Sequence, residues 1–290
     1  MLLEKLYRNK EIILKKSQEF FQNSSSLVPK IGCELEFFLL ADGVPASPKA
    51  VDDFILELKA EKERGASQIE IKTDFTSDLV KLCDELTEKK NFIKNLAAKK
   101  NLCASFAAQP FKDDCGNALQ FNVSLHDEND KNIFLVDKKI LTNSASSLLQ
   151  STDEIMIFLA PQAEDYQRFS FDLNYELFRK GKFSAPVNLS FGADNRTCAI
   201  RIPQSSARLE YRIAAASADP FLSIAAILLA LSLPANEGLK QIFGNAFDQQ
   251  YCLQSFCKSY EEAEKKFFSE KNFVREKFEN FISQSSYPSH

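Results

Sequence analysis

Arginine side chains at short intervals make residues 188–212 the part of this sequence best suited to chemistry. This stretch of 25 residues holds four arginines. Arg208, Glu210 and Arg212 are two residues apart, so a strand would place all three on one face. A guanidinium group is a planar fork that binds carboxylate and phosphate oxygens. Four such groups predict a site for an anionic substrate, although a surface ion-pair ladder would show the same alternation.

Carboxylates alternate with apolar residues in an earlier region of the chain. Glu34 and Glu36 would share one face of a strand, as would Gln68 and Glu70 on another, and Glu63 precedes the glycine turn before that second strand. Neighbouring carboxylates repel each other unless a cation lies between them. A site built from carboxylate oxygens, without histidine or cysteine, selects Mg²⁺ or Mn²⁺. The alternative interpretation is that these glutamates lie on ordinary surface strands and bind no metal.

A further strand, expected over residues 118–125, carries Gln120, Asn122 and Ser124 on one face. Four separate strands therefore combine a polar face with an apolar face. This pattern predicts an α+β fold in which a curved, mainly antiparallel sheet has an open polar face and is backed by helices. Carboxylates for a metal and arginines for phosphates on such a face indicate nucleotide phosphoryl chemistry.

Helices must hold these strands in place, and hydrophobic periodicity predicts several of them. Amphipathic helices are expected over residues 1–22 and 76–100, a short charged helix over 52–62, helical segments over 137–161, and a charged amphipathic helix over 255–283 that is broken near Asn272. Asp219 and Pro220 should begin a buried apolar helix. We expect an N-terminal helix and linker at 1–30, a catalytic domain at 31–245, and its helical tail at 246–290.

Composition narrows the class of protein. The chain has 290 residues and a net charge of −4, which argues against nucleic acid or an anionic membrane as a partner. Its seven cysteines form no Cys-x-x-Cys pair, so reduced thiols in a cytoplasmic protein are expected. The only histidines are His126 and His290, which excludes a histidine-rich metal site.

Several motifs in the same order resemble the catalytic core of the glutamine synthetase family. They are GCELEFFLL at residues 32–40, ERGASQIE at 63–70, YQR at 166–168, NLSFGADNRTCAIRIP at 188–203, RLEYR at 208–212 and SADPFLSIAAILLA at 217–230. The resemblance spans roughly residues 31–233. It implies an ATP-dependent ligase that phosphorylates the γ-carboxylate of glutamate or a similar acid, after which ammonia or an amine attacks the acyl phosphate.

The resemblance also implies roles for individual residues. One metal ion would be held by Glu36, Glu63 and Glu70, and the other by Glu34, Gln120 and Glu210. The substrate site would consist of Gly116, Arg168, Arg196 and Arg212, and these three arginines would also act in catalysis. ATP would contact Arg201, Arg208 and Ser124.

The sequence departs from the family pattern at several points. Gln120 and Asn122 stand where the family has two histidines, so we expect the metal position with Gln120 to be the weaker one. Ser67 replaces a glycine, and Ser184 replaces the glutamate of a flap. Only about thirty residues precede the first catalytic strand, so we expect no N-terminal β domain and a monomer or small homo-oligomer. A non-catalytic relative that binds nucleotide or glutamate is the alternative to an active ligase.

Overall fold

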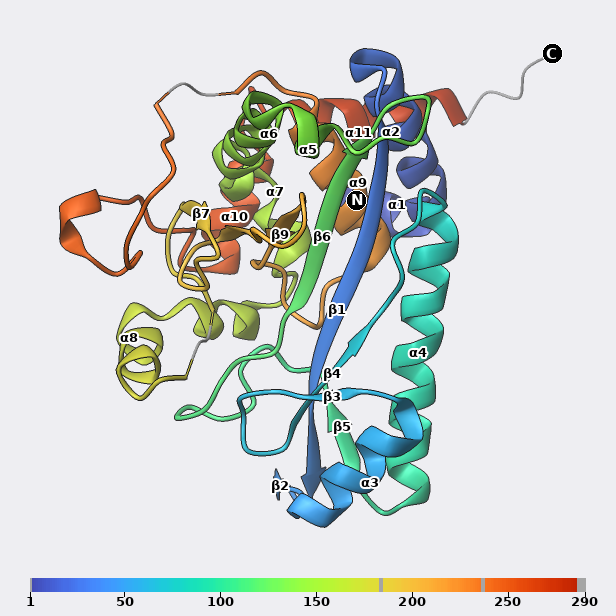
Figure 1. Ribbon diagram of the computed structural model, residues 1–290. Helices are drawn as coiled ribbons and strands as arrows, with labels where there is room; N and C mark the ends of the chain where they lie inside the picture. Colours follow the sequence, from blue (N-terminus) through green and yellow to red (C-terminus); the bar gives the residue numbers. More distant parts are fainter. Residues whose placement is uncertain (1, 183–184, 236–237, 286–290) are drawn as a thin grey trace.

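The sheet is built around β1, the long strand Val28–Ala41, which runs through the molecule in Figure 1. The computed structural model describes residues 2–182, 185–235 and 238–285. Within these residues the strands form one sheet in the order β3-β4-β1-β6-β9-β8-β7, with β2 and β5 paired to β1. The other strands are β2 Val44–Pro45, β3 Glu61–Lys62, β4 Gln68–Lys72, β5 Cys103–Ser105, β6 Leu119–His126, β7 Phe191–Ala193, β8 Ile200–Ile202 and β9 Leu209–Tyr211.

Every strand pair except β7 with β8 is antiparallel among the described residues. Successive side chains of a strand point to opposite faces, which gives the sheet one apolar face and one polar face. In β1, Leu35, Phe37 and Leu39 are fully buried and point to the face opposite Glu34 and Glu36. The predicted α+β fold, with an open and mainly antiparallel sheet backed by helices, is confirmed.

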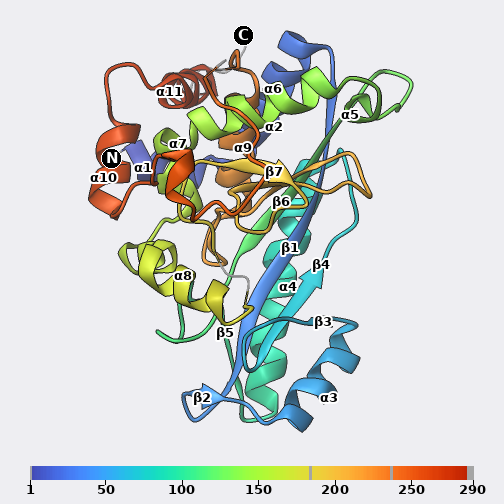
Figure 2. The same cartoon turned by 60° about the vertical axis from the view of Figure 1, so that its left-hand side comes forward.

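The helices of the described residues pack mainly on the apolar side of the sheet, but α8 lies away from it (Figure 1). They are α1 Leu2–Arg8, α2 Lys10–Ser25, α3 Pro48–Leu58, α4 Leu79–Lys99, α5 Ile133–Val136, α6 Lys138–Gln150, α7 Thr152–Leu159, α8 Phe171–Arg179, α9 Pro220–Leu231, α10 Tyr260–Phe267 and α11 Phe273–Ser285, with 3₁₀ turns at Ala163–Phe169 and Gln249–Tyr251. Helix α4 lies along the length of β1 in both views, whereas α2, α9 and α11 gather at one end (Figures 1 and 2).

Helix α9 is the centre of this helical layer. The Asp219 side chain accepts hydrogen bonds from the backbone N–H groups of Phe221 and Leu222, and Pro220 occupies the first turn, as expected. Side chains from Pro220 to Ala230 are buried, and α9 packs against α2, α4, α6, α7 and α11. No helix in the described part of the chain is long and apolar enough to cross a membrane.

The N-terminal segment differs from the single helix expected over residues 1–22. It forms two helices that meet at Asn9, whose side-chain amide donates to the carbonyl of Lys5 at 2.8 Å. An asparagine side chain competes in this way for backbone groups and breaks the helix. Helix α2 then continues to Ser25 and ends at Ser26, which is left-handed with φ 57°. Strand β1 begins at Val28, three residues before the expected start, because Val28–Lys30 already pair with β6.

The C-terminal segment breaks where the sequence predicted. Asn272 lies between α10 and α11 and is fully buried. Its side-chain oxygen accepts from the N–H of Arg275 at 2.8 Å, and its amide nitrogen donates to the carbonyl of Glu154 at 3.1 Å. The break is therefore fixed by a polar side chain that joins the two C-terminal helices to α7. None of the seven cysteines, all of which lie in the described residues, forms a disulfide.

Candidate functional site

Cross-strand pairing brings the expected polar rows onto one surface. Directly opposed residues of antiparallel strands place their side chains on the same face. The opposed pairs are Glu36 with Glu70, Glu34 with Gln120, Asn122 with Glu210, and Arg201 with Glu210. The prediction that these rows share one face of a single sheet is confirmed.

Glu36 lies at the centre of this polar face. Its side chain is buried, and one carboxylate oxygen accepts from the Gln120 amide at 2.7 Å. The other oxygen accepts from the backbone N–H of Ala118 at 2.8 Å and from the Gln68 amide at 3.3 Å. Burial raises the pKa of the Glu36 carboxyl group to about 7, against the opposing effect of Arg168. Its charged form is therefore unfavourable without a further cation.

Glu70 is in a more strongly anionic position. Burial, and then the charges of Glu34, Glu36 and Glu63, raise the pKa of Glu70 to about 9. Lys72 is the nearest cation, with its ammonium nitrogen 3.4 Å from a Glu70 oxygen, but it lies closer to Glu61. The β1–β4 end of the polar face thus holds more negative charge than its own lysine neutralises.

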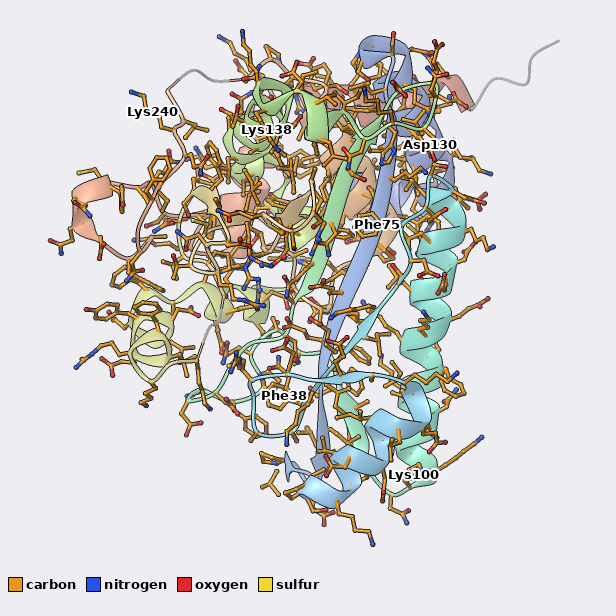
Figure 3. The ribbon with its side chains drawn as sticks, viewed as in Figure 1. Phe38, Phe75, Lys100, Asp130, Lys138 and Lys240 are labelled. Carbon is orange, nitrogen blue, oxygen red and sulfur yellow. The ribbon has the colours of Figure 1, made fainter. Side chains whose placement is uncertain are left out.

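A tight glycine contact places Glu63 at this end. A Cβ atom at Gly65 would overlap the ring of Phe38, a residue of β1 labelled in Figure 3, which packs edge-on against Phe111 with ring centres 5.4 Å apart. The N–H of Gly65 donates to the Gln68 side-chain oxygen at 3.0 Å, and the N–H of Glu63 donates to the Gln68 carbonyl at 3.0 Å. Only a glycine at this position, as in the family pattern, lets the Phe38 ring approach so closely. This packing and the backbone hydrogen bonds set the position of Glu63.

Gln68 has a positioning role that the sequence analysis did not assign. Its amide nitrogen donates to the carbonyl of Gly116 and to the Asn117 side chain, each at 3.0 Å. Gly116 packs so closely that a Cβ would lie 2.7 Å from the Ala108 carbonyl oxygen and 2.9 Å from Cγ of Arg168. A polar residue beside a glycine turn was the one available sequence signal for this role.

Glu210 lies between Arg201 of β8 and Arg212, which directly follows β9. One oxygen accepts from Arg212 at 2.7 Å and the other accepts from Arg201 at 2.7 Å. Arg208 is further away, with its nearest nitrogen 3.9 Å from Glu210, and it donates to Asn122 at 2.7 Å. Burial alone would raise the pKa of Glu210, but Arg212 and Arg201 outweigh burial and hold the pKa below its usual value.

Arg168 reaches the same region from the 3₁₀ turn Ala163–Phe169. Its guanidinium donates to the carbonyls of Ile213 at 2.6 Å and Arg212 at 2.9 Å, and its Nε atom has no hydrogen-bond partner in the part of the chain that the structure describes. Burial lowers the pKa of Arg168 to about 10. Arg168 therefore supports the backbone that follows β9 and retains one unused donor.

A narrow cavity joins the two halves of the polar face. Its lining residues are Glu36, Glu63, Arg64, Gln68, Cys115, Gly116, Gln120, Arg168, Arg196 and Arg212. The cavity thus unites three expected metal ligands, Glu36, Glu63 and Gln120, with the three expected substrate arginines. Arg196 is exposed and has no ion pair or hydrogen bond among the described residues. Arg64 and Cys115 were missed by the sequence analysis, although Arg64 directly follows Glu63.

Several predicted site residues do not line this cavity. Glu34, Glu70, Glu210, Arg201, Arg208 and Ser124 lie on the same sheet face but outside its lining. Ser124 is buried near the start of β1, where its hydroxyl contacts the Lys30 carbonyl at 3.4 Å and His126 at 3.1 Å. Ser184, where the family has a flap glutamate, lies outside the described residues.

The profile of the glutamine synthetase catalytic domain matches residues 49–285, which is most of the chain. The chain belongs to the glutamine synthetase family. The predicted resemblance is thereby confirmed. Members of this family use ATP and divalent metal ions.

Curated relatives include both glutamine synthetases and ligases for other amines. The chain is 28% identical over 201 residues to γ-glutamylputrescine synthetase PuuA of Escherichia coli, covering 65% of this chain and 40% of that protein. It is 30% identical over 197 residues to glutamate–isopropylamine ligase of a Pseudomonas species, covering 64% and 40%. The glutamine synthetase of Haemophilus influenzae is 29% identical over 185 residues, covering 61% and 37%. The chain thus spans about two fifths of the length of these relatives.

Solved structures show the same fold. The GmaS/ADP complex in conformation 1 superposes with a TM-score of 0.77 at 19% identity, over 97% of this chain and 75% of that one. Ligand-free GmaS gives a TM-score of 0.76 at 20% identity, with the same coverage.

The two expected metal positions differ in the partners of their donor groups. No three acidic, histidine or cysteine side chains in the described ranges converge in an arrangement that could hold a metal ion. At the Glu36, Glu63 and Glu70 position, the donors are all carboxylates, and this donor chemistry suits Mg²⁺ or Mn²⁺ once the side chains converge on the ion.

At the second expected position, the donors are already occupied. Both oxygens of Glu210 accept from arginines, and the side-chain oxygen of Gln120 accepts from Arg212 at 3.1 Å. The expectation that Glu34, Gln120 and Glu210 form the weaker metal site stays a prediction. In this structure the charge of Glu210 is neutralised by two guanidinium groups, and the uncharged Gln120 amide accepts a hydrogen bond from one of them.

Proposed function

We propose that this chain is an ATP-dependent ligase that forms a γ-glutamyl amide from glutamate, or a glutamate-like acid, and an amine or ammonia. The reaction would take place in the cytoplasm. One observation carries the proposal: the narrow cavity brings Arg168, Arg196 and Arg212 next to Glu36 and Glu63. Arginines suit the carboxylates of the acid, and the adjacent carboxylates suit the cation that accompanies ATP.

The proposed chemistry has two steps. An oxygen of the γ-carboxylate attacks the γ-phosphorus of ATP, the bond from that phosphorus to the bridging oxygen breaks, and ADP leaves. The amine nitrogen then attacks the acyl carbon, phosphate leaves with the C–O bond electrons, and the nitrogen loses a proton. A divalent cation at Glu36, Glu63 and Glu70 would neutralise charge on the phosphoryl group.

The arginines would supply most of the binding and stabilisation. Arg196 has no protein partner in the described chain, so it is available to bind a substrate carboxylate. Arg212 lies at the inner wall and would face the transferring phosphoryl group. Arg201 and Arg208 lie further along the sheet, and we assign them, with Ser124, to ATP.

Similarity to relatives favours an organic amine as the acceptor. γ-Glutamylputrescine synthetase and glutamate–isopropylamine ligase carry amines in their names, and their matches cover slightly more of this chain than that of the Haemophilus influenzae glutamine synthetase. We therefore extend the acceptor class from ammonia to alkyl amines and diamines.

Phosphate release tests this proposal. Purified protein would be assayed with ATP, glutamate and a panel of ammonia, methylamine, isopropylamine and putrescine, in Mg²⁺ and in Mn²⁺. Release that requires both glutamate and an amine is expected. Replacing Arg196→Gln should lower kcat/KM for glutamate by roughly 100-fold, as expected for a lost substrate-positioning group.

Arg179→Gln is the matched control for Arg196→Gln. Arg179 is also exposed, but it pairs with Glu176 on α8 and does not line the cavity. Its replacement should leave phosphate release unchanged. Equal losses for both variants would contradict the proposed role of Arg196.

A non-catalytic binding protein is the second candidate. The hydrogen bonds from Arg201 and Arg212 to the two Glu210 oxygens favour this binding function. The family places this glutamate on a metal ion, whereas here it pairs with arginines of the same protein. If the protein binds ATP but releases no phosphate with any amine of the panel, the result supports the binding function and contradicts the ligase function.

A further inference from the structure

Gln120 takes part in a hydrogen-bonded row that crosses three strands. Its amide nitrogen donates to Glu36 of β1 at 2.7 Å, and its oxygen accepts from Arg212 beside β9 at 3.1 Å. A carboxylate can only accept and a guanidinium can only donate, so these neighbours fix the orientation of the amide. The Gln120 oxygen therefore already points to a cationic protein group.

Arg212 continues the row to Glu210. The same guanidinium nitrogen that contacts Gln120 donates to Glu210 at 2.7 Å, and Arg201 completes the row from the other side at 2.7 Å. The side chains of Glu210 and Arg212 are 3% and 7% exposed, so water screens this pair weakly. One buried cation thus bridges two of the groups that the family would place on a metal ion.

We propose that the guanidinium group of Arg212 takes the place of the second divalent cation, so that the site of this chain holds at most one such ion. The proposal rests on the proposed function only for the location of the two metal positions. A divalent ion between Gln120 and Glu210 would lie against two guanidinium groups, and it would need to displace the hydrogen bonds that Arg212 makes to both.

The first metal position lacks such a substitute. No arginine side chain hydrogen-bonds to Glu36, Glu63 or Glu70 in the described ranges, where Glu63 accepts from the backbone N–H of Arg64 at 3.0 Å and the only ion pair is from Lys72 to Glu70 at 3.4 Å. The difference between the two positions is therefore the presence of Arg212. Removing that side chain should free the glutamine oxygen and one carboxylate oxygen together.

Counting bound Mn²⁺ tests the proposal without any substrate. Chelator-treated protein would be titrated with Mn²⁺ alone, and free Mn²⁺ would be followed by its electron paramagnetic resonance signal. Wild type should bind no more than one ion per chain, and Glu210→Gln should bind as many ions as wild type. Arg212→Ala should gain one ion relative to wild type.

Arg201→Ala is the matched control for Arg212→Ala. It also removes a guanidinium from Glu210 but leaves the contact from Arg212 to Gln120 in place, so it should gain no ion. Two ions bound by wild type, a loss of ions in Glu210→Gln, or no gain in a folded Arg212→Ala would each overturn the proposal. If Arg212→Ala does not fold, the counts for wild type and Glu210→Gln still decide.

The count is independent of turnover. Wild type with at most one ion and no ligase activity would sink the proposed function and leave the role of Arg212 standing. Ligase activity with two ions per chain would do the reverse.

Discussion

Buried charge is distributed unevenly over the polar face. Around Glu210, arginines neutralise the carboxylate and hold its pKa down. Around Glu70, other carboxylates add to the effect of burial and raise the pKa to about 9. An ionised Glu70 therefore costs free energy in the metal-free protein, and that cost is expected where a cation is to be bound.

Stability of the metal-free protein should depend on pH through Glu70. Because its pKa is raised in the folded state, the folded protein binds the proton more tightly than the unfolded chain does. The contribution of the Glu70 carboxyl group to the free energy of unfolding is fully present at pH values below its usual pKa of 4.5. This contribution is lost as the pH rises toward about 9. Glu70→Gln keeps the neutral form, so it should raise the free energy of unfolding at pH 8 by roughly 2 kcal/mol, with one pKa unit worth about 1.4 kcal/mol.

Urea denaturation in the presence of a chelator would measure this effect at pH 5 and pH 8. Little change is expected at pH 5. Glu57→Gln serves as the control, since Glu57 lies on the surface and pairs with Lys100, which is labelled in Figure 3. If the free energy of unfolding at pH 8 is lower for Glu70→Gln than for wild type, an ionised Glu70 does not destabilise the folded protein and the prediction is wrong.

Two interactions at the start of α9 join the helical layer together. Asp219 caps the helix through two backbone N–H groups, and its other oxygen forms an ion pair with Lys10 of α2 at 2.6 Å. The same ammonium lies 4.7 Å from the centre of the Phe221 ring. The residue that begins α9 thus also positions α2 against it.

Two substitutions should separate the cap from the ion pair. Asp219→Asn can still cap the helix but loses the charge, so we expect a loss below about 1 kcal/mol that shrinks in high salt. Asp219→Ala loses both, and should cost about 2 kcal/mol. Thermal unfolding at low and high salt would measure this. Equal losses for the two variants would assign the whole effect to the ion pair.

At the scale of the molecule, one apolar core includes both ends of the described chain. Leu6, Phe21, Phe121, Leu228 and Phe278 belong to the same buried cluster. Helices α2 and α11 contact each other and also α9, so the first and last helices support the layer beneath the sheet. We therefore expect the N-terminal helices to unfold together with β1 and β6.

Phe21→Ala should test this cooperation. Phe21 is buried on α2, and a phenylalanine-to-alanine change in a core costs about 3–5 kcal/mol. Hydrogen exchange should then accelerate in β6 as much as in α2. Phe92→Ala on the exposed side of α4 is the control and should have little effect. Faster exchange confined to α2 would show that the N-terminal helices open independently.

The sequence by itself determined which side chains share a face. Strand alternation is a local property, so the rows Glu34–Glu36, Gln68–Glu70 and Arg208–Arg212 were predictable before any pairing was known. The buried helix after Asp219 was predictable for the same reason, since its cap, proline and apolar run are contiguous. Boundaries were less accurate, as Asn9 shows, because a side chain competes there with the helix.

Which of these groups neutralise one another depends on the tertiary structure. Gln120 and Arg212 are 92 positions apart, and Arg168 donates to a carbonyl 45 positions away. The residue order places Arg208 and Arg212 equally near Glu210, but Arg212 donates to it at 2.7 Å, Arg208 lies 3.9 Å away, and the second donor is Arg201 on another strand. That distinction depends on the register of β6, β8 and β9, because hydrogen bonds and screened charges act over a few ångströms in space and not along the chain.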